Sequence, residues 1–172
     1  MSEPSVYDVH APKLAAKGYH PLPIRGKVPA VYVPSFGELR NMPDWCNPRR
    51  PIETSPQPGA GVGIRLGLQA CGIYLVAIDW DDESIAIAAM DKFPATIMKE
   101  GRRGFTAFYQ SDRPIASRDF RINGRVVMQI LSDGRQTVLP PTIHPETARP
   151  YVWSSKHSLF DLGAGELPEI RQ

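Results

Sequence analysis

Proline is the residue that most limits how this chain can fold. It occupies 18 of 172 positions, about twice its usual share of roughly 5%. Because proline lacks a backbone N–H and clashes with the preceding helical turn, long helices are disfavoured. The prolines concentrate in residues 21–58 and 140–150. We therefore expect short strands, tight turns and fixed loops.

The remaining composition predicts one globular domain spanning residues 1–172. The chain is 42% hydrophobic and 22% charged, which are ordinary globular values. Cys46 and Cys71 lie outside any CxxC pattern, so we expect reduced thiols in a cytoplasmic protein, with a single disulfide as the alternative. No apolar run approaches the roughly 18 residues of a membrane span, and the first residues lack a secretory pattern. We expect no membrane partner.

A net charge of +2 hides local contrasts. Residues 10–50 carry seven basic and two acidic side chains, and residues 99–135 carry eight basic and four acidic ones. An acidic cluster at residues 79–83 lies between these two regions. Such a pattern suits a metal-dependent enzyme acting on a polyanion, although an ordinary mixed surface would also produce it.

The N-terminal part, residues 8–60, is predicted to form a small loop-rich αβ unit. A helix is expected over 8–18 and an extended segment over 20–24. Repeated Pro and Gly turns indicate that residues 25–60 are loop-rich. A short helix is expected there around residues 38–45.

The part from 61 to 168 is predicted to form a sheet core. A continuous apolar run at 72–80 indicates a buried strand, and an acidic start followed by apolar residues indicates a helix at 82–93. Asn123-Gly124 between two β-rich runs predicts a hairpin. Further strands are expected at 61–67, 95–101, 105–110 and 150–153, a hairpin turn at 132–134, and a short helix or turn at 158–163. The order of these elements indicates an α+β fold with a mostly antiparallel sheet.

The most informative local pattern is Ala77-Ile78-Asp79-Trp80-Asp81. Residues two apart on a strand face the same side, so Asp79 and Asp81 should project together from the end of a buried strand. Trp80 should face the opposite side and pack. Two adjacent carboxylates repel each other unless a cation lies between them, and such oxygen ligands suit Mg²⁺ or Mn²⁺.

Two other interpretations of this acidic pair stay open. Asp79 could instead cap the helix that follows, with Asp81 exposed in the turn. An apolar strand ending in Asp-x-Asp also occurs in haloacid-dehalogenase-like phosphatases. Those proteins usually continue with a small turn residue and Thr, whereas this chain continues with Asp82-Glu83.

Five segments in order resemble the N-terminal primase–polymerase domain of phage, prophage and plasmid replication proteins, part of the archaeo-eukaryotic primase superfamily. They are LAAKGYHPLPIRGKVP at 14–29, GVGIRLG at 61–67, VAIDWD at 76–81, FPATIMKEGRRGFTAFY at 93–109 and ILSDGRQTVLPPTIHPETARPYVW at 130–153. The resemblance covers about residues 10–168, and PPTIHPET…PYVW is its most specific part. It implies a primase-like catalytic core with an RNA-recognition-motif-like, mostly antiparallel sheet, beside the small N-terminal αβ unit.

The resemblance also implies roles for individual residues. The first family motif, hhhDhD, places Asp79 and Asp81 as catalytic ligands of Mg²⁺ or Mn²⁺. The second motif normally ends in His, where this chain has Thr106. The third supplies another acidic metal ligand, where this chain has Gln129. The chain departs from the family at both of these positions, so the resemblance implies two protein carboxylates at the metal rather than three.

The other candidates come from charged and proline-fixed loops. Arginine suits bidentate phosphate contact and could supply the charge that Thr106 lacks. His144, on a loop held by prolines, could contact a nucleotide, or it could be a structural histidine satisfied by backbone carbonyls. The nucleotide-binding candidates are Arg103, Thr106, Thr142, His144 and Arg135, and the nucleic-acid-binding candidates are Lys27 and Arg102.

Three hypotheses about function follow. The first is a DNA primase/polymerase that uses nucleoside triphosphates, a DNA template and primer, and Mg²⁺ or Mn²⁺. The second is a catalytically degenerate relative that binds nucleic acid or nucleotide and acts with a helicase, carried on a separate chain or a C-terminal domain. The third is a metal-dependent phosphatase or nuclease that uses the same acidic pair.

Overall fold

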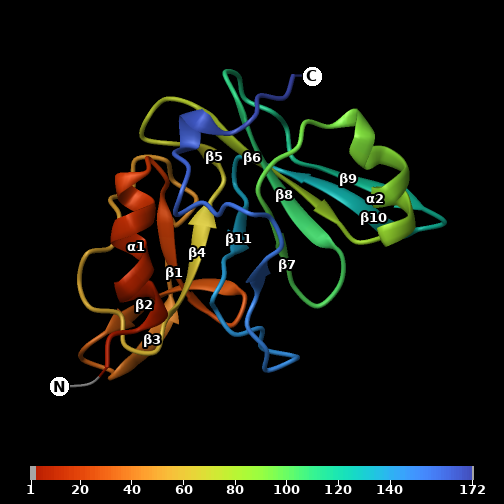
Figure 1. The fold of residues 1–172 in the computed structure, drawn as a ribbon. Helices are drawn as coiled ribbons and strands as arrows, with labels where there is room; N and C mark the ends of the chain where they lie inside the picture. Colours follow the sequence, from red (N-terminus) through yellow and green to blue (C-terminus); the bar gives the residue numbers. More distant parts are fainter. Residues whose placement is uncertain (1–2, 172) are drawn as a thin grey trace.

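A computed structural model describes residues 3–171 (Figure 1). It contains two sheets of antiparallel strands, with short helices on their outer sides. This confirms the predicted α+β class. No helix within residues 3–171 has the length and apolar character needed to cross a membrane. The elements are α1 (Val6–Ala16), β1 (Pro21–Arg25), β2 (Val28–Val33), β3 (Glu38–Asn41), β4 (Gly61–Arg65), β5 (Gly67–Leu68), β6 (Tyr74–Trp80), α2 (Glu83–Ala89), η1 (Met90–Lys92), β7 (Met98–Glu100), β8 (Phe105–Ser111), β9 (Arg118–Ile122), β10 (Arg125–Leu131), β11 (Gln136–Val138), β12 (Val152–Trp153) and η2 (Ala164–Glu166).

The first sheet has the order β11-β4-β1-β2-β3 and carries α1 beside it (Figure 1). The helix predicted over residues 8–18 is confirmed, but it begins earlier. Ser5 is its N-cap and forms a reciprocal capping box with Asp8, which satisfies N–H groups at the helix start. Tyr7 and Leu14 on α1 are buried against this sheet.

For residues 25–60, one hairpin was not predicted and one predicted helix was wrong. The region contains the hairpin of β2 and β3, with Val31 opposite Arg40. The short helix expected around residues 38–45 is absent, because residues 38–41 form β3 and turns follow it. The pattern around β3 is weak because Leu39 is its single buried residue.

The second sheet has the order β12-β7-β8-β6-β10-β9, with β5 also paired to β6. The predicted buried strand is β6, and the predicted hairpin is β9–β10. Asn123 and Gly124 both have positive φ, 49° and 77°, as a two-residue hairpin turn requires. α2 covers one face of this sheet, where Ile78, Trp80 and Ala107 pack with Ala86.

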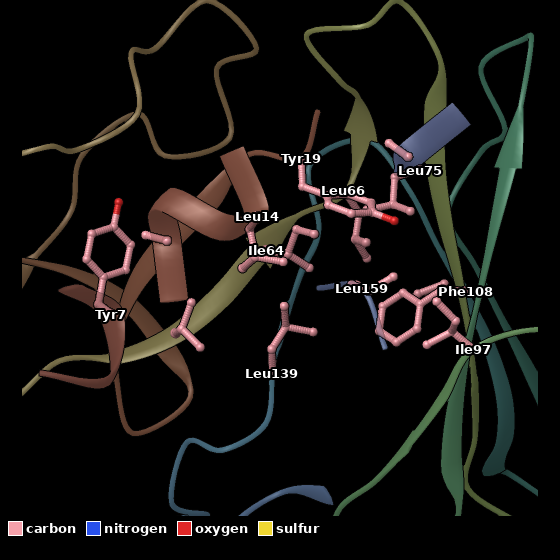
Figure 2. Packing of buried hydrophobic residues seen from close by; sticks show 14 of the residues in the cluster. Tyr7, Leu14, Tyr19, Ile64, Leu66, Leu75, Ile97, Phe108, Leu139 and Leu159 are labelled. Atoms are coloured by element: carbon pink, nitrogen blue, oxygen red, sulfur yellow. The ribbon is translucent and has the colours of Figure 1, made fainter. Parts of the chain in front are cut away.

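The main core lies between α1, the first sheet and the opposite face of the second sheet (Figure 2). In Figure 2 this cluster runs from Tyr7 and Leu14 through Leu139 to Phe108 and Ile97. On β6 the residues that enter it are Leu75 and Ala77. The next two positions of the same face are Asp79 and Asp81, so this apolar layer ends where the acidic pair begins.

The chain crosses between the two sheets three times, from β4 to β5, from β10 to β11 and from β11 to β12. The predicted strand at 61–67 is divided into β4, in the first sheet, and β5, in the second. The turn at 132–134 does not form the predicted hairpin, because β11 pairs with β4 rather than with β10. The expected division of the domain into residues 8–60 and 61–168 stays a prediction, although β4 and β11 both lie in the first sheet.

Candidate functional site

A row of five polar residues crosses the second sheet from strand to strand. In register, Lys99 on β7 lies opposite Thr106 on β8, and Thr106 lies opposite Asp79 on β6. Asp79 lies opposite Gln129 on β10, and Gln129 lies opposite Asp119 on β9. Directly paired residues share one face of a sheet, so all five side chains belong to the face turned toward the first sheet.

The acidic pair is placed by the alternation of β6. Trp80 is 3% exposed and packs on the α2 side, as predicted. Asp79 and Asp81 lie on the other side and line a common cleft. Asp79 does not cap the helix that follows, which was the alternative interpretation. The cap of α2 is Asp82, whose carboxylate accepts hydrogen bonds from the N–H groups of Ser84 and Ile85.

The cleft between the two sheets has a volume of about 500 Å³. Basic and acidic side chains face each other across it, because the β1–β2 turn, the segment after β7 and the proline-rich loop of residues 140–150 all reach its edge. Its lining residues are Lys27, Asp79, Asp81, Lys99, Gly101, Arg102, Arg103, Phe105, Thr106, Leu131, Gln136, Thr137, Val138, His144, Glu146 and Tyr151. A cleft of about 620 Å³ between α1 and residues 52–58 is mostly apolar and carries no such charge pattern.

Asp79 is oriented by its neighbour on β8. The Thr106 hydroxyl donates a hydrogen bond of 2.6 Å to Oδ1 of Asp79. Thr106 is buried, so this bond is protected from competing water. It leaves Oδ2 of Asp79 available for another ligand.

The surroundings of Asp81 show an excess of negative charge. Burial first, and then the charge of Asp79, raises the pKa of the Asp81 carboxyl. Asp119 adds to this effect, and Arg125 opposes it. A bound cation would relieve the repulsion between these carboxylates.

Glu146 joins two basic residues at the mouth of the cleft. Its carboxylate accepts from the Lys27 ammonium at 2.9 Å and also forms an ion pair with Arg102. All three side chains are about half exposed. Lys27 and Arg102, the predicted nucleic-acid contacts, are thus brought together by a residue that the sequence analysis did not single out.

His144 lies in the cleft lining and is buried. Its Nδ1 accepts a hydrogen bond of 3.2 Å from the Glu146 N–H, and its ring packs at 5.2 Å from that of Tyr151. Burial, with the charge of Lys27 second, lowers the pKa of His144. A neutral ring with Nδ1 as acceptor carries its proton on Nε2, which is a hydrogen-bond donor.

Three predicted site residues lie outside the cleft lining. The Thr142 hydroxyl accepts from the Val62 N–H at 2.7 Å and donates to the Val62 carbonyl at 3.0 Å, so it fixes the proline-rich loop to β4. Arg135 is an exposed residue of the turn before β11. Gln129 is the register partner of Asp79, but its amide donates at 2.8 Å to Asp119.

The sequence analysis named Thr106 and His144 among the buried polar residues of the cleft but missed Lys99. It counted Lys99 only as part of a basic region. A usable signal was its position two residues after Ile97, an apolar residue just before β7 that is buried in the main core, because residues two apart in extended chain face the same side. Gln136 was also missed; its Oε1 is buried without a hydrogen-bond partner, while its Nε2 donates to the Lys27 carbonyl.

No group of three or more metal-ligating residues occurs within residues 3–171. The donor set nevertheless suits a hard cation held by two carboxylates, because Mg²⁺ usually takes one or two carboxylates and completes its shell with water and substrate phosphates. Asp79 and Asp81 provide that pair.

Cys46 and Cys71 are both free and exposed, and the expectation of unpaired thiols is confirmed for this structure.

Comparison with known families gives a match over nearly the whole chain. The family model described as bifunctional DNA primase/polymerase, N-terminal, matches residues 11–170. Comparison with curated proteins gives no match. The match covers both sheets, the acidic pair and the whole proline-rich loop.

Proposed function

The chain belongs to the bifunctional DNA primase/polymerase N-terminal family, and on this premise we propose that it extends DNA by metal-dependent, template-directed nucleotidyl transfer in its cleft. The observation that carries the proposal is the joint position of Asp79 and Asp81 in a cleft that also holds Arg103 and Lys99. Such a cleft offers carboxylates for a cation and basic groups for a triphosphate.

Asp79 and Asp81 would hold the Mg²⁺ or Mn²⁺. When bound, the ion neutralises charge on the triphosphate and lowers the pKa of an attacking hydroxyl. The hydrogen bond from Thr106 keeps the Asp79 carboxylate in one orientation. Partners that orient a metal ligand in this way commonly affect metal affinity.

The basic residues of the cleft would bind the nucleotide. Arg103 lines the cleft and makes no ion pair with another residue of 3–171, so its guanidinium can contact phosphate oxygens in a bidentate manner. His144 can donate from Nε2 to a phosphate or sugar oxygen. Thr142 and Arg135 are not part of this proposal, because the cleft lining excludes both.

The DNA would enter at the mouth of the cleft, where Lys27 and Arg102 are half exposed. Their contacts would be to backbone phosphates, which position a nucleic acid without reading its sequence. Binding should then weaken steeply with salt. We place this activity in the replication of a phage, prophage or plasmid, as the resemblance implies.

A second candidate function is binding without catalysis, in concert with a helicase. Two observations favour it: Thr106 and Gln129 are uncharged, and residues 3–171 contain no three-ligand metal cluster. This alternative predicts salt-sensitive DNA binding with little dependence on metal. A phosphatase or nuclease is less well supported, because the matched family is one of primases and polymerases.

A primer-extension assay tests the proposal. The wild-type protein should incorporate deoxynucleotides on a primed template with Mn²⁺ or Mg²⁺. Asp79→Asn and Asp81→Asn should abolish incorporation while keeping the thermal unfolding profile. Asp91→Asn, at an exposed position in η1, is the matched control. Absence of incorporation with either metal on every template would contradict the proposal and favour binding without catalysis.

A further inference from the structure

Lys99 is a buried lysine that faces the candidate nucleotide. It lies on β7, is 5% exposed and lines the cleft with Asp79 and Arg103. Its register partner on β8 is Thr106, and its partner on β12 is Trp153. Lysine is almost never fully buried unless it is paired.

The Lys99 ammonium has no such partner in the part of the chain that the structure describes. No carboxylate of residues 3–171 forms an ion pair with it, and no oxygen of these residues accepts a hydrogen bond from it. Its Nζ lies over the face of the Tyr151 ring, at 4.9 Å from the centroid. Burial lowers the pKa of Lys99 to about 8, although the charge of Asp79 opposes this shift.

A charge in this position disfavours the folded state of the ligand-free protein. Burying an ammonium is costly unless it is paired and hydrogen-bonded. An apolar residue of similar length would pack at the same place without that cost. An unpaired ammonium at the wall of a cleft is therefore best explained as a group that binds an anionic ligand.

We propose that Lys99 binds the phosphate groups of the nucleoside triphosphate and supplies, from the strand beside Thr106, the positive charge that Thr106 lacks. This inference rests on the proposed function, because it deepens the assignment of the same cleft. Lysine presents three donors as a compact charge, which suits a phosphate rather than a planar carboxylate. The alternative role for Lys99 is structural: its charge would merely balance that of Asp79.

Binding of inorganic tripolyphosphate without metal tests the proposal directly, since this probe needs neither base nor template. By titration calorimetry, Lys99→Met should bind it at least about 10-fold more weakly than wild type, the loss of one charge-assisted contact. Lys92→Met, an exposed lysine outside the cleft, should bind like wild type. If Lys99→Met fails to fold, Lys99→Gln takes its place.

Thermal unfolding separates binding from a structural role. The ligand-free Lys99→Met protein should unfold at the same temperature as wild type or a higher one, and the rise caused by tripolyphosphate should be lost. A structural partner of Asp79 would give the reverse: a lower unfolding temperature without ligand and a preserved rise with it. That result would overturn the proposal.

The two proposals fail in different ways. If wild type binds tripolyphosphate through Lys99 but incorporates no nucleotide, the Lys99 assignment holds and the polymerase assignment fails. If wild type incorporates nucleotides and Lys99→Met binds tripolyphosphate equally well, the Lys99 assignment is overturned and the polymerase assignment holds. Failure of wild type to bind tripolyphosphate at all would also overturn the Lys99 assignment.

Discussion

The Thr106 hydroxyl on β8 donates a 2.6 Å hydrogen bond to Oδ1 of Asp79 on β6. The two residues are direct register partners, so the sheet itself aligns donor and acceptor. Threonine here orients a carboxylate, whereas the histidine that the family resemblance places at this position would donate to a phosphate oxygen. The hydrogen bond to Asp79 therefore differs from the contact that the resemblance implies for this position.

Thr106→Val should remove the hydrogen bond that orients the Asp79 carboxylate while keeping the shape of the side chain at position 106. We expect Mn²⁺ affinity to fall about 10-fold, as for other residues that orient a metal ligand, and stability to fall by about 1 kcal/mol. Thr96→Val is the matched control, because Thr96 donates to the Phe108 carbonyl outside the cleft. Unchanged Mn²⁺ affinity in a folded Thr106→Val protein would show that this bond does not matter for the metal.

Glu146→Gln should free Lys27 and Arg102 for anions. Exposed ion pairs contribute about 0.2–1 kcal/mol each, so tripolyphosphate should bind roughly 2–10-fold more tightly once the competing carboxylate charge is gone. Titration calorimetry at fixed salt measures the change. Glu38→Gln, which breaks the exposed 2.7 Å pair with Arg40, should have no effect. Weaker binding by Glu146→Gln would mean that Glu146 holds the two cations in their binding positions.

Gly104 permits the close approach of β8 to the end of β6. Its φ is +58°, and a Cβ placed there would lie 1.6 Å from the Trp80 carbonyl oxygen and 3.5 Å from the Asp81 Cα. Gly104→Ala should therefore reduce stability by more than about 3 kcal/mol, a severe effect for one substitution. The measurement is urea unfolding.

Gly124→Ala is the control for this prediction. Gly124 has a similar φ of +77°, but a Cβ there would meet open space. Its cost should be about 1–2 kcal/mol, from backbone strain alone. Equal costs at Gly104 and Gly124 would contradict the importance of the contact with β6.

His20 should make stability depend on pH. Burial first, then the charges of Arg65 and Arg50, lowers its pKa from 6.5 to about 4, and its Nε2 is buried without a partner. The folded protein thus binds fewer protons than the unfolded chain between these values. The contribution of neutral His20 to the free energy of unfolding is complete above about pH 6.5. It is lost as pH falls toward about 4, which lowers the stability by about 1–3 kcal/mol.

Chemical unfolding of wild type and His20→Gln from pH 4 to 7.5 measures this effect. As pH falls, the free energy of unfolding of wild type should decrease relative to that of His20→Gln. Carboxylates elsewhere titrate alike in both proteins, so their contribution cancels in the difference. A difference that stays constant with pH would show that His20 takes up its proton as readily in the folded as in the unfolded chain.

Local sequence patterns predicted several elements of the fold and the position of the acidic pair. The apolar run of β6, the acidic start of α2 and the Asn-Gly turn of β9–β10 were all identified, and Asp79 and Asp81 do share one cleft. These features depend on neighbours within a few residues. Strand alternation alone was enough to place the acidic pair and Trp80 on opposite faces.

Features that depend on distant contacts were not predicted. β11 pairs with β4, more than 60 residues earlier in the chain, and a turn sequence cannot specify that partner. β2 was missed because it contains Pro29, and β3 because three of its four residues are exposed, so both resemble a loop. Lys99 looked like a solvated charge because it packs against residues distant in the chain, such as Tyr151, whose ring lies beside its ammonium.

Crystals grown with Mn²⁺ and a non-hydrolysable deoxynucleoside triphosphate would test the central claim most directly. Anomalous scattering should place manganese between the carboxylates of Asp79 and Asp81, with phosphate oxygens within hydrogen-bond distance of Lys99. A triphosphate bound outside this cleft, or no manganese at Asp79 and Asp81 under saturating conditions, would contradict the account.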